Sequence, residues 1–367
     1  MLTIILVILL FASLVLVHEW GHFILARRNG VGVEEFGFGF PPKLYGRVRR
    51  GVLYSINLLP LGGFVRLKGE DAADRGPGTF GAARFGVQTK ILLAGVAMNL
   101  LSAVVLLYGL CLTGLPGLGA PFEPSFLHPA YAQPKQLLAA EVSVGSPAAK
   151  AGLARGDYLL AVDSQALATD QALRDFTQAH AGHTVSLRVS HAGQERTITV
   201  KLRPPGTTDG FLGVAAQQVY KLRYDPLSAL VAALYITGAL FVATIVGVVQ
   251  LIIHIPALIL GLFSSSVPQA AEAASGPVGI VFILKSLSSL GASYIILFMA
   301  NISVALAAFN VLPLPALDGG RLAVLAVQRL TKRTWSAEVE ARYHGIGFMV
   351  LIGLMLLISV YDLRKYF

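Results

Sequence analysis

The sequence contains several apolar runs that are each long enough to cross a membrane. Stretches of about 20 or more mostly apolar residues, the length that an α-helix needs to span a bilayer core, alternate with polar segments. The runs lie near residues 2–26, 90–114, 228–262, 293–316 and 343–361. With 55% hydrophobic and only 13% charged residues among 367, the pattern predicts a polytopic α-helical membrane protein.

The first run is expected to be a retained transmembrane helix rather than a secretory signal. No basic segment precedes it, no small-residue cleavage site follows it, and its apolar character continues up to Arg27 and Arg28.

Between the first two runs, short pieces of alternating apolar and polar residues are broken by glycine and proline, which is typical of β-structure. The stretch "LPLGG" at 59–63 predicts a turn that joins strands near 52–58 and 64–68. Its apolar content favours a hairpin that lies against or dips into the membrane, and a plain juxtamembrane sheet is the alternative. Strands at membrane depth need their backbone groups covered by protein or facing a wet cavity.

Residues 137–216 form a polar island with the pattern of a small α+β domain. The stretch "SPAAKAGLARGDYLLAVD" at 146–163 resembles a PDZ domain of the kind attached to bacterial proteases, and "GFLGV" at 210–214 fits its closing strand. PDZ domains bind an extended peptide as an added strand, often through its C-terminal carboxylate. We therefore expect a peptide or C-terminal segment as partner here, with a spacer or plug as the alternative.

The basic residues predict the orientation in the membrane. The net charge is +9, but the positive residues flank the apolar runs and form no stripe with interleaved aromatics, which argues against nucleic acid. By the positive-inside rule, the two loops richest in them face the cytoplasm, so the N-terminus and the PDZ domain are expected outside. These residues are Arg27, Arg28, Lys43, Arg47, Arg49, Arg50, Arg66, Lys68, Arg84 and Lys90 in the first loop, and Arg321, Arg329, Lys332 and Arg333 in the last.

The run at 228–262 does not fit a single crossing, because one crossing there would reverse the sidedness of the last loop. We expect a segment that lies in the interface, enters and leaves on one side, or forms a hairpin, with Pro256 beside His254 as a break point. The expected parts of the chain are 1–28 (first helix), 29–89 (cytoplasmic-side sheet or re-entrant hairpin), 90–114 (second helix), 137–216 (PDZ), 226–275 (interfacial or hairpin), 276–320 (third core segment) and 342–363 (last helix).

The first apolar run contains the motif H-E-x-x-H, as His18, Glu19 and His22. Ionisable groups inside a membrane helix are costly and are rarely kept without a function. Positions i and i+4 share one helix face, so both imidazoles can bind one zinc ion, while Glu19 reaches the water activated by the metal as a general base. The pattern predicts a catalytic zinc site that needs a third protein ligand.

Asp318 is the best candidate for that ligand. It follows an apolar run that ends at a basic loop, as the first motif does, and it lies in "FNVLPLPALDGGRL". Pro313 and Pro315 forbid a regular helix, and open backbone at membrane depth survives where it lines a polar cavity. The alternative is that Asp318 only begins the next helix.

Together these motifs resemble the site-2 protease family of intramembrane zinc metalloproteases, in particular the bacterial regulator-of-sigma-E type. "GGFVRL" at 62–67 is similar to the membrane-reentrant hairpin of the family, "AGVAMN" at 94–99 to its second-span motif and "SGPVGI" at 275–280 to the segment before its third span. Three departures are Val96 where many relatives have proline, a single PDZ domain, and the strongly apolar 228–262 run.

The resemblance implies one Zn²⁺ per chain held by His18, His22 and Asp318, with Glu19 as the catalytic base. It also implies a multi-pass protein of the bacterial inner membrane that cleaves single-span transmembrane proteins, such as anti-sigma factors, in contact with the lipid bilayer. The residues expected to bind substrate are Asn310, Pro313, Pro315, Gly62, Gly63 and Phe64.

Two rival functions use the same residues differently. A non-catalytic, zinc-containing PDZ scaffold would leave Glu19 idle. A metal transporter would need ionisable residues in several successive spans, whereas His254 is the chief one beyond the motif.

Four further residues are expected to carry no chemistry. Cys111, the single cysteine, is expected to be a buried inert thiol. His180, His183 and His191 are expected to be solvated.

Overall fold

The computed structural model describes residues 2–366 except 71–75, 120, 134, 168, 192–193, 207–209, 262–274 and 289. The chain forms two compact units. The first contains residues 1–109, 230–288 and 294–367, and the second contains residues 110–229 and 289–293. The second unit therefore interrupts the first in sequence, as an inserted domain does.

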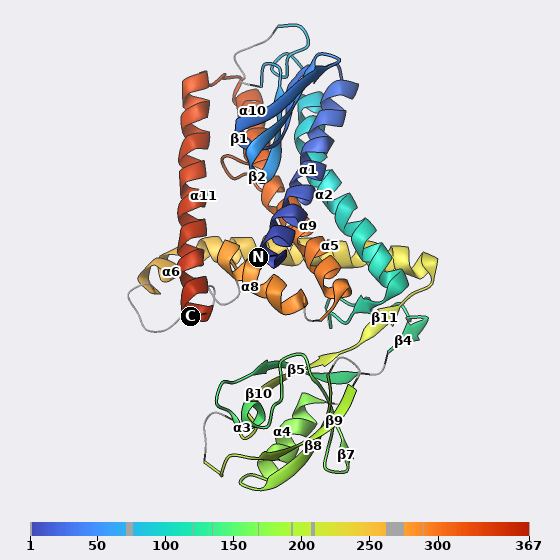
Figure 1. Ribbon diagram of the computed structural model, residues 1–367. Helices are drawn as coiled ribbons and strands as arrows, with labels where there is room; N and C mark the ends of the chain where they lie inside the picture. Colours follow the sequence, from blue (N-terminus) through green and yellow to red (C-terminus); the bar gives the residue numbers. More distant parts are fainter. Residues whose placement is uncertain are drawn as a thin grey trace. The chain divides into compact units, whose positions relative to one another are not determined.

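Eight helices of the described residues belong wholly or mainly to the first unit (Figure 1). Five of these, α1, α2, α5, α9 and α11, are long and apolar enough to cross a membrane, which agrees with a polytopic helical membrane protein. The helices are α1 (Leu2–Arg28), α2 (Phe85–Thr113), α5 (Pro226–Ile253), α6 (Ile255–Gly261), α8 (Pro277–Ser288), α9 (Ala292–Val311), α10 (Asp318–Thr331) and α11 (Ala337–Tyr366).

Strands β1 (Val33–Arg49) and β2 (Val52–Leu67) pair in one sheet, and each reverses direction partway along. The first part of β1 lies between the two parts of β2: Phe36 is opposite both Val65 and Tyr54. The second part of β1 pairs with the first part of β2 from Arg49↔Val52 to Lys43↔Asn57. The expected hairpin of 52–58 with 64–68 was therefore wrong as a direct pairing, because residues 33–40 insert between the two strands.

This insertion places residues 63–67 at one edge of the sheet. Residues 52–58 have partners on both sides, whereas residues 63–67 have the first part of β1 on one side and α1 on the other. Here the backbone comes very close to the helix: a Cβ on Gly62 would meet Val15, and one on Gly63 would meet Leu16. The small residues of "GGF" thus allow the edge of the sheet to approach α1 closely.

A cluster of buried apolar side chains joins this sheet to α1 and α2. It includes Ala26 of α1 and Ile91 of α2, packed with Val33, Val52 and Leu67 of the sheet. Burial of each of the larger side chains, valine, leucine and isoleucine, contributes about 1.5–3 kcal/mol. The cluster therefore holds the sheet, α1 and α2 in a fixed arrangement around the last two turns of α1.

The second unit contains an α+β domain with strand order β10-β5-β6-β8-β9, where β10 lies at the edge. Its apolar core is centred on Leu137, Leu159, Leu187 and Val200. Ser146 caps a short helix by accepting from the Ala149 backbone amide. Its elements are β5 (Gln136–Val142), α3 (Pro147–Lys150), β6 (Tyr158–Val162), β7 (Gln165–Ala166), α4 (Asp170–Ala179), β8 (Thr184–His191), β9 (Gln194–Lys201) and β10 (Val214–Val219), beside a small sheet of β3 (Leu115–Pro116), β4 (Tyr131–Ala132) and β11 (Lys221–Arg223).

The apolar segment 226–275 begins as one uninterrupted helix. α5 continues to Ile253 and α6 starts at Ile255, so the helix breaks at His254, beside Pro256. No reversal occurs within α5, and Figure 1 draws its axis across that of α11. Residues 262–274 of this segment lie outside the described residues. That the whole segment lies in the interface, enters and leaves on one side, or forms a hairpin stays a prediction.

Candidate metal centre

Three possible metal ligands from two distant parts of the chain converge in the first unit. The Nε2 atoms of His18 and His22 lie 3.1 and 3.3 Å from one carboxylate oxygen of Asp318, and 3.1 Å from each other. All three ligand atoms lie within 4.8 Å of one another. Both histidines are 7% exposed, so the group is buried between α1 and the start of α10.

Helix α2 closes one side of this group through its glycine. A Cβ on Gly95 would lie 2.5 Å from the Nε2 atoms of both His18 and His22, closer than side chains approach one another. On α1, Gly21 lies between the two histidines in sequence and packs against the Ala94 carbonyl of α2, which a Cβ on Gly21 would meet at 2.5 Å. Glycine at these two positions therefore allows α1 and α2 to approach closely where the imidazoles meet.

The outer nitrogen of each imidazole has a partner on α2. His22 Nδ1 donates a hydrogen bond to the Ile91 carbonyl, 2.7 Å away, so its Nε2 keeps a free lone pair for a metal. His18 Nδ1 lies 3.2 Å from the side-chain amide of Asn99, which is fully buried. Ser303 of α9 donates to the backbone carbonyl of Asn99. Sequence reasoning missed Asn99, although it belongs to the "AGVAMN" motif.

Asp318 is the first residue of α10 and follows an irregular loop, residues 312–317. Ala316 in this loop has φ +69°, in the left-handed region that L-residues rarely adopt. Gly319 and Gly320 pack against the carbonyls of Leu312 and Leu314, where a Cβ would clash. The "LDGG" sequence thus folds the loop back tightly onto the helix that it begins.

Glu19 shares a cavity of about 180 Å³ with His22 and Asp318. The backbone N–H of Val65, on the edge strand of the sheet, donates to its carboxylate. Phe64 lines the same cavity. The sheet edge therefore runs directly beside the proposed catalytic base.

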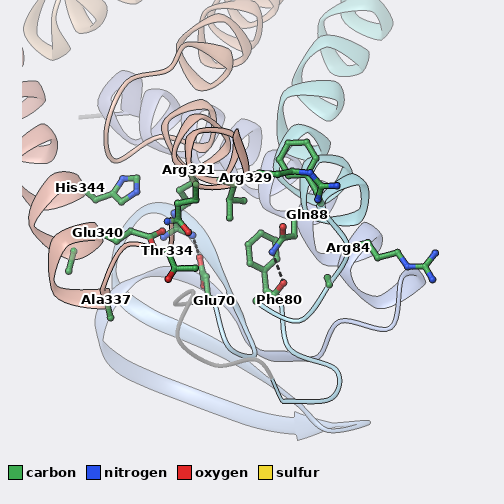
Figure 2. Close-up of a pocket in the computed structure, with 16 residues that line it drawn as sticks. Glu70, Phe80, Arg84, Gln88, Arg321, Arg329, Thr334, Ala337, Glu340 and His344 are labelled. Carbon is green, nitrogen blue, oxygen red and sulfur yellow. Dashed lines mark hydrogen bonds and ion pairs between the residues drawn. The ribbon is translucent and has the colours of Figure 1, made fainter. Parts of the chain in front are cut away.

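A second cavity of about 440 Å³ shares Glu70, Phe80 and Arg321 with the first (Figure 2). Arg321 of α10 forms an ion pair with Glu70. Burial alone would lower the pKa of Arg321, but the Glu70 carboxylate raises it above its ordinary value, so this guanidinium stays charged.

The residues expected to bind substrate fall into two groups. Phe64 lines the metal cavity, whereas Gly62 and Gly63 pack against α1. Among the described residues, Asn310, Pro313 and Pro315 are not part of the cavity wall. Asn310 instead donates to the Leu306 carbonyl of its own helix.

Similarity to known proteins extends over nearly the whole chain. A Clostridium perfringens protein is 30% identical over 360 residues, which are 98% of each chain. Zinc metalloprotease RasP of Geobacillus kaustophilus is 27% identical over 443 aligned residues, covering 98% of this chain and 97% of the relative, and RasP of Oceanobacillus iheyensis is 25% identical over the full length of both.

Among solved structures, the PDZ domain of an SdrC-like protein from Listeria monocytogenes matches 22% of this chain and 85% of that domain, with 23% identity and a TM-score of 0.20. The family model described as peptidase family M50 matches residues 6–354, a range that includes both histidines, Glu19 and Asp318. The converging ligands and this match agree: the chain belongs to peptidase family M50.

Proposed function

We propose that this protein is an intramembrane zinc metalloprotease that hydrolyses peptide bonds within or near transmembrane helices of single-span proteins. The observation that carries the proposal is the meeting of His18, His22 and Asp318 beside Glu19, within and next to an apolar helix. Ionisable groups at such a depth have little structural use, which argues against a scaffold with an idle glutamate.

The ligand set fits zinc. Two imidazole nitrogens and one carboxylate oxygen are the ligand types found in catalytic zinc sites with three protein ligands. The Ile91 carbonyl fixes His22 in the tautomer that a metal needs. When bound, zinc supplies Lewis-acid polarisation of the scissile carbonyl and makes water easier to deprotonate.

The chain's own residues would perform the remaining steps. Glu19 takes a proton from the attacking water and returns it to the leaving amine, since its carboxylate shares the cavity with the ligands. A helical substrate hides its peptide bonds, so it must first become extended. We propose that the extended segment lies against the strand Gly63–Leu67, which runs beside Glu19, with Phe64 in contact with its side chains.

The decisive test replaces Glu19 with glutamine in the purified, zinc-loaded protein and measures cleavage of a single-span reporter. We expect Glu19→Gln to retain zinc and to lose about 10²–10⁴-fold in cleavage rate, the usual contribution of a general base. The matched control is Glu34→Gln, at an exposed site on the sheet, which should cleave normally. Unchanged cleavage in Glu19→Gln would contradict the proposal.

The second unit offers a separate site for peptides. A cavity of about 540 Å³ lies between α4 and the edge strand β10, beside the "GFLG" turn at 210–213. We propose that an extended peptide pairs with β10 there and directs its C-terminal carboxylate to the backbone amides of this turn. Peptides with a free C-terminus should therefore bind the full-length protein more tightly than the same peptides amidated. Equal affinities for the two forms, measured by fluorescence anisotropy, would exclude carboxylate recognition.

We further propose that the protein lies in the bacterial inner membrane with its N-terminus and the second unit outside. The support is the concentration of basic residues in the sheet region and in the loop before α11.

A further inference from the structure

The loop that carries Asp318 toward the histidines has little regular structure of its own. Residues 312–317 lie between the end of α9 and the start of α10 and form no helix or strand. Ala316, two residues before Asp318, has a left-handed backbone with φ +69°. Such a conformation costs a non-glycine residue about 1–3 kcal/mol and persists only where surrounding contacts impose it.

Helix α11 supplies two of those contacts. The Ala316 N–H donates to Nδ1 of His344, 2.9 Å away. Gly347, which is buried one turn further along α11, packs so closely against Pro315 that a Cβ there would overlap the proline ring. Positions i and i+3 share one face of a helix, so His344 and Gly347 together present a polar acceptor and a flat surface to the loop.

These contacts act on the loop at the point that sets the direction of Asp318. Because Ala316 donates its N–H to His344, the rotation of its backbone is tied to a side chain on another helix. The carboxylate of Asp318 lies 3.1 Å from His18 Nε2, and a change at Ala316 would swing this carboxylate away from α1. Second-layer contacts of this kind usually affect metal affinity or activity by about 10–100-fold.

We propose that His344 is a positioning residue of the metal centre: its Nδ1 holds the Ala316 N–H, and with Gly347 it keeps the Asp318 carboxylate aimed at the two histidines. The inference rests on the zinc site of the proposed function but not on proteolysis. His344 touches neither the ligands nor the substrate cavity around Glu19. It lines the neighbouring cavity of about 440 Å³ instead, and its proposed effect on Asp318 passes through the Ala316 N–H.

The test compares three substitutions at His344 by zinc affinity, measured by competition with a chromophoric chelator, and by the absorption spectrum of the Co²⁺-loaded protein. Asparagine carries an acceptor oxygen on Cγ, where histidine carries Nδ1, so His344→Asn should retain wild-type affinity and spectrum. Glutamine places its acceptor one bond further away, and leucine has none. His344→Gln and His344→Leu should lose about 10–100-fold in zinc affinity and show an altered Co²⁺ spectrum.

A glycine pair on the same helix gives an independent test. Gly347→Ala should disturb the loop and weaken zinc binding, whereas Gly345→Ala adds the same methyl group where nothing lies within 4 Å and should leave affinity unchanged. His254→Leu is the matched histidine control, because His254 is exposed and its Nδ1 donates to the Gln250 carbonyl of α5, away from residues 312–317 in sequence.

The outcomes separate the two proposals. Wild-type zinc affinity and Co²⁺ spectrum in folded His344→Leu, or equal affinities in Gly347→Ala and Gly345→Ala, would overturn the role of His344. If His344→Leu does not fold, the Asn and Gln variants and the glycine pair decide the question. A protein that binds zinc with the expected dependence on His344 but cleaves no reporter helix would refute the protease and leave this inference standing.

Discussion

At the scale of single residues, the tautomer of each histidine decides whether a metal can bind. For His22, the Ile91 carbonyl accepts from Nδ1 and so fixes the tautomer with a free Nε2. For His18, Nδ1 faces the side chain of Asn99. The Asn99 Nδ2 atom faces the ring, and Oδ1 has no hydrogen-bond partner among the described residues. If the amide is turned over, Oδ1 accepts from His18 Nδ1–H, which satisfies the oxygen and frees Nε2 for the metal.

With Oδ1 as the acceptor, two substitutions of Asn99 should differ in their effect on zinc affinity. Asn99→Asp keeps the acceptor and should retain zinc affinity, whereas Asn99→Leu removes it and should weaken zinc binding by about 10–100-fold. Zinc competition titrations measure both. Ser102→Ala is the control on the same helix, since Ser102 donates to its own helix at the Met98 carbonyl. Weakened binding in Asn99→Asp together with full binding in Asn99→Leu would show that the amide does not act as the acceptor.

The candidate metal ligands could be proposed from sequence because the patterns that mark them are local. An i, i+4 pair on a helix is visible in the letters, and Asp318 is marked by the prolines and glycines around it. Asn99 and His344 could not be predicted in this way. Their roles depend on which side of α2 faces His18 and which turn of α11 meets residue 316, and neither follows from spacing within one segment.

At the scale of elements, one buried carboxylate joins the last helix to the start of α8. Asp362 of α11 is 2% exposed and accepts hydrogen bonds from the backbone amides of Gly276 and Gly279, at 2.9 and 2.8 Å. These two N–H groups lie at the start of α8, where backbone donors have no partner within the helix. The glycines of "SGPVGI" leave room for the carboxylate, because a Cβ on Gly279 would lie 2.7 Å from one of its oxygens.

Removing this carboxylate should loosen α8 from α11. Asp362→Ala leaves two buried N–H groups without an acceptor, at a cost of about 1–3 kcal/mol for each, so the protein should unfold at a lower temperature in detergent. Glu338→Ala is the control, because Glu338 is an exposed acid on the same helix. Equal unfolding temperatures for the two variants would contradict a role of Asp362 in holding α8.

The sheet shows where prediction by element fails. Alternation and the "LPLGG" stretch correctly indicated strands and a reversal near 59–63, but they implied that the flanking strands pair with each other. The pairing instead depends on residues 33–40, whose Phe36 lies between Val65 and Tyr54. A pattern of period two fixes which face of a strand is buried and says nothing about which strand lies beside it.

At the scale of the whole molecule, sidedness depends on an even number of crossings between the second unit and α9. If α1, α2, α9 and α11 each cross once, the basic loops of the sheet and before α11 face the same side only when α5, α6 and α8 together return to the side where they began. The positive-inside rule requires this arrangement. The length and apolarity of α5 alone would allow a crossing, which is why the sequence left several topologies open.

Cysteine labelling can decide between these topologies, because Cys111 is the single cysteine and is buried. In a Cys111→Ala background, Val144→Cys reports on the second unit, where Val144 is fully exposed, and Arg333→Cys reports on the exposed loop before α11. In intact spheroplasts a membrane-impermeant maleimide should label the cysteine at 144 at once and the cysteine at 333 only after the membrane is opened. Labelling of both from outside would mean that α5 or its continuation crosses the membrane. The loop before α11 and the basic sheet region would then lie on opposite sides of the membrane, against the positive-inside rule. This result would contradict the proposed orientation.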